Sequence, residues 1–141
     1  MPNHITNILT IESSDEVRVK EILESICYDG KLGTFDLEKV IPIPENIYRG
    51  NLGAKEYAQY GANNWYDFCI KSWSTKWNSY AYEYFDEYEA GSNTIKFFTA
   101  WSAPHKVFEK LSCMFPDVEI KYKCRGLASV LEKAHSYAVL M

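Results

Sequence analysis

Hydrophobic positions along the chain follow two repeats, one typical of strands and one typical of helices. Residues 4–11 are rich in apolar and β-branched side chains, which predicts a strand. Beyond Ser13, apolar residues recur three and four positions apart, which predicts a helix that stops near Gly30. Ser13 and Glu16 have the spacing of an N-terminal capping box. The apolar stripe of this helix comprises Val19, Ile22, Leu23, Ile26 and Cys27.

The middle of the chain is less regular. Residues 35–43 read as an extended segment at a sheet edge or exit, because prolines follow at positions 42 and 44. Glycines punctuate residues 45–61, which read as an inserted loop with one helical turn over 55–60. Residues 64–78 hold three of the four tryptophans. Their apolar spacing predicts a short amphipathic helix that runs directly into the sheet.

A predicted hairpin follows, formed by residues 79–89 and 94–101 around the turn at 91–93. The alternation places a row of tyrosines on one side, expected to face the helices, and leaves Phe85 facing outward among acidic residues. This row consists of Tyr80, Tyr82, Tyr84 and Tyr88.

The last third of the chain repeats the helix and strand periods. Ser102 is expected to cap a helix with Pro104 in its first turn. Residues 118–124 alternate as a strand, and the apolar residues of 127–138 have the spacing of a final helix. The apolar stripe of the helix after Ser102 comprises Val107, Phe108, Leu111, Met114 and Phe115.

The order of these elements predicts an α+β fold. Without the insertion at about 45–77, it is the order of a ferredoxin-like split β-α-β antiparallel sheet with helices packed on one face. An inserted helix and a C-terminal helix are added to that core. The length of 141 residues predicts a single domain over residues 1–141.

Composition narrows the function classes. The net charge of -4 argues against a protein held on nucleic-acid phosphates, whereas 16% aromatic residues favour contact surfaces. No CxxC pair is present, so no metal site is expected; Cys27, Cys69 and Cys113 are expected to be buried on helices. No leader or membrane-spanning run is found, which predicts a soluble protein of a reducing cytoplasm.

Catalytic signatures are missing from the sequence. No nucleophile elbow, phosphate-binding loop, dinucleotide-binding glycine motif or zinc-protease motif occurs. The carboxylates near residue 86 read as a solvated or partner-facing edge. We therefore expect no catalytic residue and no cofactor, and interpret the chain as a non-enzyme.

Four motifs resemble those of the Api92-like proteins, also called the YubB-like ferredoxin-like domain family. They are MPNHITN at residues 1–7, FDLEKVIPIPE at 35–45, NWYD to TKWN at 64–78, and FTAWSAP at 98–104. The family is found largely in phages, prophages and plasmids. The resemblance implies a ferredoxin-like fold and a mobile-element origin, and it supplies no established reaction. The predicted helix after Gly126 departs from the acidic, Gly-rich and extended tail of the family.

The first functional hypothesis is a non-catalytic accessory protein that binds a host protein, for example a defence complex such as a CRISPR effector. The acidic-aromatic strand supplies its expected contact surface, with the inserted loop as the second choice. In the strand these residues are Tyr82, Glu83, Tyr84, Phe85, Asp86, Glu87, Tyr88 and Glu89. In the loop they are Tyr48, Arg49 and Tyr57.

The alternative hypothesis is a small-ligand or nucleotide-binding module. Its candidate pocket consists of His4, Trp65, Asp67, Lys76 and Trp101. A single-stranded nucleic-acid binder ranks below both, because the strand over residues 94–101 lacks the basic, Gly-aromatic motif of RNA-recognition sheets. An exposed sheet edge would also allow a homodimer.

Overall fold

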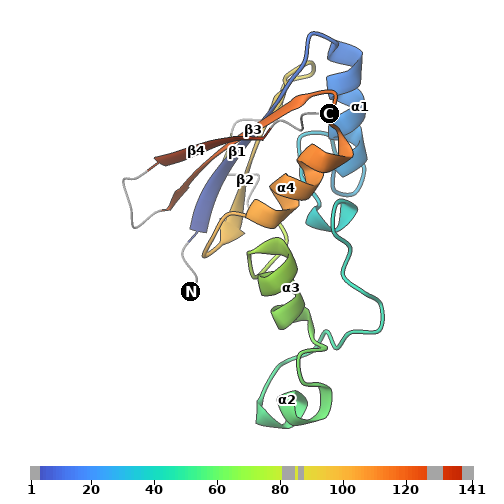
Figure 1. The fold of residues 1–141 in the computed structure, drawn as a ribbon, viewed down its shortest axis with the longest axis vertical. Coiled ribbons are helices and arrows are strands. Elements are labelled where there is room, and N and C mark those ends of the chain that lie inside the picture. The colour runs from blue at the N-terminus through green and yellow to red at the C-terminus, as the bar shows by residue number, and fades with distance from the viewer. Residues whose placement is uncertain (1–3, 81–84, 86–87, 127–131, 138–141) are drawn as a thin grey trace.

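The computed structural model describes residues 4–80, 85, 88–126 and 132–137 (Figure 1). The first half contains β1 (His4–Glu12), α1 (Glu16–Ile26), the 3-10 helix η1 (Leu37–Lys39), α2 (Ala54–Tyr60) and α3 (Trp65–Trp73). The second half contains β2 (Thr94–Ala100), α4 (His105–Met114), β3 (Glu119–Gly126) and β4 (Glu132–Tyr137).

The four strands form one sheet in the order β2-β1-β3-β4. β1 is antiparallel to both β2 and β3, and β4 is antiparallel to β3. β2 and β3 are therefore parallel, with β1 between them and α4 as their connection. This arrangement, with α1 and α4 on one side of the sheet in Figure 1, confirms the predicted α+β class.

The core lies between the sheet and these helices. On β1, alternate residues such as Leu9 and Ile11 are fully buried, and the intervening ones are only partly covered. The register places Phe97 of β2 and Tyr122 of β3 on the same inner face. All residues of the stripe predicted for α1 are buried, which confirms that helix as core-facing.

Tryptophan 73 joins α3 to this core. Its side chain is 1% exposed, and its indole Nε1–H donates to the Ile41 carbonyl at 2.8 Å. A buried indole needs such an acceptor, because an unpaired N–H away from water is costly. The segment around Ile41 is thereby held against α3 and the sheet.

Two predicted helix caps are wrong. Asp15, not Ser13, caps α1: its Oδ1 accepts from the N–H groups of Val17 at 3.1 Å and Arg18 at 3.2 Å. A carboxylate satisfies the free N–H groups of the first turn and suits the positive end of the helix dipole. α4 begins after Pro104, and the Ser102 hydroxyl donates to the Ser74 carbonyl instead of capping the helix.

Residues 35–43 are not an extended strand, because a short helix occupies their centre. Asp36 caps η1 through an Oδ1 that accepts from the Glu38 N–H at 3.0 Å. The Leu37 N–H donates to Asn78 Oδ1 at 2.9 Å, a contact distant in the sequence. These local and long-range hydrogen bonds outweigh the extended preference that the prolines indicate.

The predicted C-terminal helix is also wrong, because residues 132–137 form β4. They pair with β3, Glu132 opposite Arg125 and Tyr137 opposite Ile120. The helical spacing of apolar residues is a local signal, whereas the unpaired edge of β3 offers hydrogen bonds to a whole strand. The extended structure that the family resemblance implies after the last strand is thus present.

The cysteines and the end of α4 differ in part from expectation. Cys27 and Cys69 are buried, whereas Cys113 is exposed. Burial raises the pKa of the Cys69 thiol to about 12, with the Glu38 carboxylate acting in the same direction. The predicted apolar stripe of α4 buries Val107, Phe108 and Leu111, whereas Met114 at its end is 39% exposed.

Candidate binding surfaces

A lysine enclosed by two tryptophans lies at the end of β2. Lys76 Nζ is 4.5 Å from the ring centroid of Trp77 and 4.7 Å from that of Trp101. Both indoles remain accessible, Trp77 at 38% and Trp101 at 46%. We call Lys76, Trp77 and Trp101 the tryptophan clamp. A cation held on aromatic faces is attracted to both rings and orders them.

The backbone that carries the clamp is held in an unusual conformation. Ser74 and Trp101 both have a φ of 69°, in the left-handed region that a bulky non-glycine residue rarely occupies. Thr75 Oγ1 donates to the Ala100 carbonyl at 2.7 Å, and the Ser102 hydroxyl donates to the Ser74 carbonyl. Such strain persists only where the surroundings impose it, and it concentrates at binding sites.

An aromatic cluster around His4 adjoins the clamp. The Tyr80 hydroxyl lies 2.6 Å from His4 Nδ1, and the His4 ring stacks on Phe98 with centroids 5.4 Å apart. Burial raises the pKa of the Tyr80 hydroxyl. The Trp77 ring lies 6.2 Å from that of Tyr80, and the Phe85 ring packs edge-on against Phe98 at 5.2 Å.

This cluster shows which way Tyr80 faces. Tyr80 pairs with Phe98 in an isolated antiparallel bridge, and Phe98 alternates with the buried Phe97. Tyr80 therefore lies on the side of the sheet opposite the helices, contrary to expectation. Tyr88 packs against the core, as expected, and its hydroxyl donates to the Ser92 carbonyl at 2.5 Å. Phe85 does face outward but is half-buried on Phe98.

We call the side of β1, β2 and β3 opposite the helices the open face. Strand alternation and register bring four cationic side chains to it, although the chain as a whole is acidic. Lys121 forms an ion pair with Glu12 at 2.9 Å. The other three are exposed and make no ion pair with any described residue. They are Lys96, Lys123 and Arg125.

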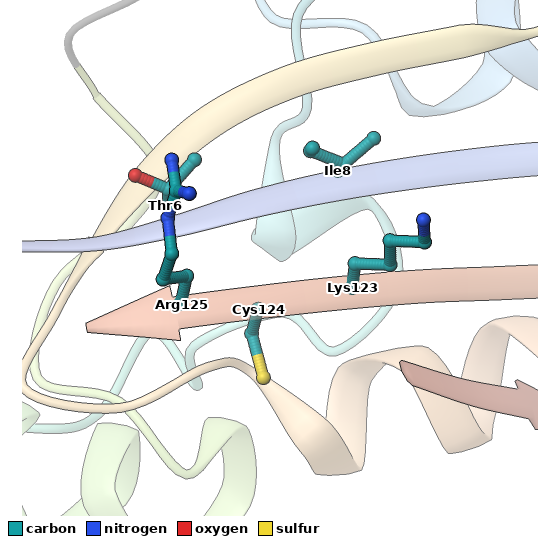
Figure 2. Close-up of a pocket in the computed structure, with 5 residues that line it drawn as sticks. All are labelled: Thr6, Ile8, Lys123, Cys124 and Arg125. Carbon is teal, nitrogen blue, oxygen red and sulfur yellow. The ribbon is translucent and has the colours of Figure 1, made fainter. Parts of the chain in front are cut away.

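A shallow hollow of about 70 Å³ lies on this face, and Figure 2 shows the residues that line it. The side chains of Thr6, Ile8, Lys123 and Arg125 rise around it, whereas the Cys124 thiol points to the other side of the sheet. Pockets that enclose small molecules measure roughly 300–1,000 Å³. The hollow is therefore suited to contact with a surface-bound group and does not enclose a whole ligand.

A second surface lies at the far end of the molecule from the sheet. We call residues 48–64 the arm; it carries α2, beyond α3 in Figure 1. No residue of α2 is buried. The arm is closed by a parallel bridge between Tyr48 and Asn64 and by the stacked rings of Tyr48 and Tyr60, 4.5 Å apart.

Further hydrogen bonds order the base of the arm. Trp65 Nε1 donates to the Gly50 carbonyl at 2.8 Å, and Asn64 Nδ2 donates to Asp67 Oδ2 at 2.7 Å. Tyr57 is 41% exposed, and desolvation raises the pKa of its hydroxyl, with Asp67 and Tyr66 acting in the same direction. The arm thus presents tyrosines on a defined backbone.

The candidate pocket inferred from the sequence is divided between these places. Lys76 and Trp101 are in direct contact, and His4 is linked to them through Tyr80 and Trp77. Trp65 and Asp67 belong to the base of the arm. No hydrogen bond, ion pair or ring contact among the described residues joins them to His4 or Lys76.

The expected partner-binding residues have mixed positions. Tyr82, Glu83, Tyr84, Asp86 and Glu87 lie outside the described residues, and Glu89 is exposed. Arg49 is also exposed, and its Nη2 donates to the Ile43 and Pro44 carbonyls, both at 3.3 Å. The sequence analysis did not predict that Lys96, Lys123 and Arg125 lie together. That prediction needs both the alternation of side chains along each strand and the register between the strands.

One comparison with known proteins finds a family match within the second half of the chain. Residues 72–129 match the family model of the ferredoxin-like domain in Api92-like protein. The match confirms the resemblance inferred from the sequence motifs. No curated protein and no solved structure matches the chain. The Api92-like segment includes the tryptophan clamp, β2, α4 and β3, and the arm precedes it.

Two further properties of the described part of the chain concern membrane-spanning helices and metal sites. None of the helices in that part of the chain is long and apolar enough to cross a membrane. In the same part, no group of three or more His, Cys, Asp or Glu side chains is placed to hold a metal ion.

Proposed function

We propose that this protein is a non-catalytic accessory protein that binds a protein of a bacterial host through its arm. The single observation that carries the proposal is that α2 buries none of its residues, although a bridge and stacked rings close the arm that carries it. Because this ordered segment adds nothing to the core, its surface is free to contact a partner.

The chemistry of the arm supports a protein partner. Tyr48, Tyr57 and Tyr60 offer large, rigid contact area at low cost in side-chain entropy, as tyrosines do in antibody binding loops. Lys55 and Glu56 balance each other in charge, so the tip has no strong attraction for a polyanion. A neutral, tyrosine-rich tip fits a groove or pocket of another protein.

The identity of the partner is a narrower proposal. Resemblance to proteins of phages, prophages and plasmids favours a target in the infected cell. A defence complex such as a CRISPR effector is one such target, because a small accessory protein inhibits it by occupying one surface.

Capture from bacterial lysate tests the role of the arm. Immobilised wild type is compared with a Tyr57→Ala/Tyr60→Ala variant and with Tyr28→Ala, which removes a 49% exposed tyrosine distant from the arm in sequence. Central interface tyrosines are worth about 2 kcal/mol or more each. We expect the double variant to lose a protein that wild type and Tyr28→Ala retain.

Two outcomes contradict this proposal. If the arm variant retains the same proteins as wild type, the arm is not the contact surface. If a Glu83→Ala/Phe85→Ala/Glu87→Ala variant loses the partner while the arm variant keeps it, the acidic-aromatic segment is the contact surface instead. Circular dichroism of each variant checks that the fold is kept.

A nucleotide or small-ligand module is the second candidate, favoured by the tryptophan clamp. A ligand that binds only the folded state raises the melting temperature. Absence of a shift across a panel of nucleotides would remove this candidate.

The finer fold is also a proposal: residues 79–89 add a strand beside β2 and complete a second split β-α-β unit. The bridge supports it, since the Tyr80 N–H donates to the Phe98 carbonyl at 3.1 Å and the Phe98 N–H donates back at 3.0 Å. Rapid amide exchange throughout residues 80–88 would contradict it.

A further inference from the structure

The open face combines cations and aromatic rings in one continuous strip. In the register of the sheet, Arg125, Thr6 and Phe98 stand side by side across β3, β1 and β2. The neighbouring row consists of Lys123, Ile8 and Lys96. The tryptophan clamp adjoins the strip at the end of β2, through Trp77 and Tyr80.

The charged side chains on this strip are mainly cationic. Among the described residues of β1, β2 and β3, carboxylates stand on the open face only at the far end, where Glu12 and Glu119 lie 2.9 Å and 3.8 Å from Lys121 Nζ. Lys96 and Lys123 have no ion pair with any described residue, and they stand on either side of Ile8. Arg125 stands in the neighbouring row, beside Thr6.

The spacing of the cations suits an extended chain of negative charges. Residues two apart on a strand, such as Lys123 and Arg125, lie roughly 7 Å apart, and Lys96 lies two strands away at roughly 10 Å. Separate cations at such intervals bind successive groups of a polyanion and release its counterions. The shallow hollow between Lys123, Arg125 and Thr6 leaves room for one such group against the sheet.

The aromatic part supplies what a purely basic surface lacks. Trp77 and Trp101 remain 38% and 46% exposed, and Lys76 holds both rings in place. Unstacked bases bind to exposed aromatic rings, whereas the bases of a duplex are stacked on each other and out of reach. Cations beside accessible rings therefore favour a single strand over a duplex.

From these observations we infer that the open face and the tryptophan clamp bind single-stranded nucleic acid. Phosphates contact Lys96 and Lys123, with Arg125 beside them, and a base stacks on Trp77 or Trp101. This activity is separate from partner binding by the arm, which lies at the other end of the molecule in Figure 1. The net charge of -4 does not oppose it, because the described carboxylates of β1, β2 and β3 on the open face lie at the end away from Lys96 and Lys123.

Fluorescence anisotropy with a labelled oligothymidine at low salt tests the inference. The informative variant is Lys96→Ala/Lys123→Ala. Its matched control is Lys31→Ala/Lys110→Ala, which removes the same charge from exposed positions after α1 and on α4. We expect the first pair to weaken binding at least tenfold, and to lower the slope of log Kd against log salt by about 1.4, since each single-strand phosphate contact contributes about 0.7.

The aromatic contribution is tested with Trp77→Ala, and with Trp77→Phe as the conservative variant. Loss of one stacked base is expected to weaken binding at least about fivefold, with recovery in Trp77→Phe. Circular dichroism confirms that each variant is folded. Tyr28→Ala, an exposed aromatic outside the strip, is expected to bind as wild type does.

Several outcomes would overturn the inference. They are no binding of oligothymidine at low salt, equal loss in both lysine pairs, or equal affinity for a duplex together with an unaffected Trp77→Ala variant. Binding of a mononucleotide as tightly as the oligomer would point to a small-ligand site in place of a strand. The Lys96→Ala/Lys123→Ala variant leaves the arm unchanged, so it is expected to capture the same host protein as wild type. Loss of nucleic-acid binding in this variant can therefore be told apart from loss of partner binding.

Discussion

At the scale of single residues, backbone conformation and contact decide which positions tolerate change. Gly33 has a φ of 98°, and a Cβ placed on it would collide with the Tyr88 side chain. Gly30 has a φ of 72°, but a Cβ there would meet nothing within 4 Å. Both glycines relieve the same backbone restriction, and only Gly33 also makes room for a neighbour.

This pair permits a controlled prediction. Gly33→Ala is expected to lower the free energy of unfolding by about 1–3 kcal/mol more than Gly30→Ala, because it adds overpacking to the shared backbone strain. Urea denaturation of the two variants measures the difference. Equal effects would mean that Tyr88 moves aside at no cost and that the close approach is not a constraint.

At the scale of elements, one ion pair ties α1 to the segment between α4 and β3. Arg18 Nε lies 2.7 Å from Asp117 Oδ2, and its guanidinium carbon lies 5.3 Å from the centre of the Phe115 ring. The hydrogen bond from Arg18 holds the pKa of the Asp117 carboxyl below its usual value. The charged form of Asp117 is therefore favoured in the folded state.

The sign of the pH effect follows from that direction. A depressed carboxyl pKa adds stability above the unfolded pKa, about 3.9. That stability is lost as the pH falls through the lower folded pKa. Asp117→Asn is thus expected to lower the urea midpoint slightly at neutral pH, and the difference from wild type should vanish in strong acid. A difference of the same size at both pH values would exclude the ion pair as its cause.

Element boundaries show how far local patterns reach. Periodicity correctly predicts β1, β2, β3, α1 and α4, because each buries one face and the repeat records which residues share it. Their caps are less predictable, since Asp15 and Ser13 both suit the start of α1. Which of the two residues caps the helix depends on where the chain leaves β1. The spacing of apolar residues carries no information about that point.

At the scale of the whole molecule, β4 covers the edge of β3. Deleting residues 127–141 would leave the N–H and C=O groups of that edge unpaired and free to join another chain. We expect this truncated protein to melt at a lower temperature and to associate with itself, measured by light scattering after size-exclusion chromatography. A deletion of residues 138–141 alone keeps β4 and serves as the control.

The opposite result would be informative as well. A monomeric protein with an unchanged melting temperature would show that β4 adds little to the sheet. The expected homodimer through a sheet edge stays a prediction for the full chain, and the same light-scattering measurement tests it.

The amino-acid sequence alone determines the fold class, most of the sheet and the Api92-like resemblance, because strand and helix periods are properties of neighbouring residues. Register between distant segments decides the rest. It determines that the tail forms β4, which side of the sheet Tyr80 faces, and that His4, Lys76 and Trp101 lie near one another. The same holds for Lys96 and Lys123, which lie 27 positions apart in the sequence and stand in one row only because β1 separates β2 from β3. The net charge of the whole chain argues against a nucleic-acid partner. The positive charge on the open face of the sheet, which is visible only in the folded protein, favours one.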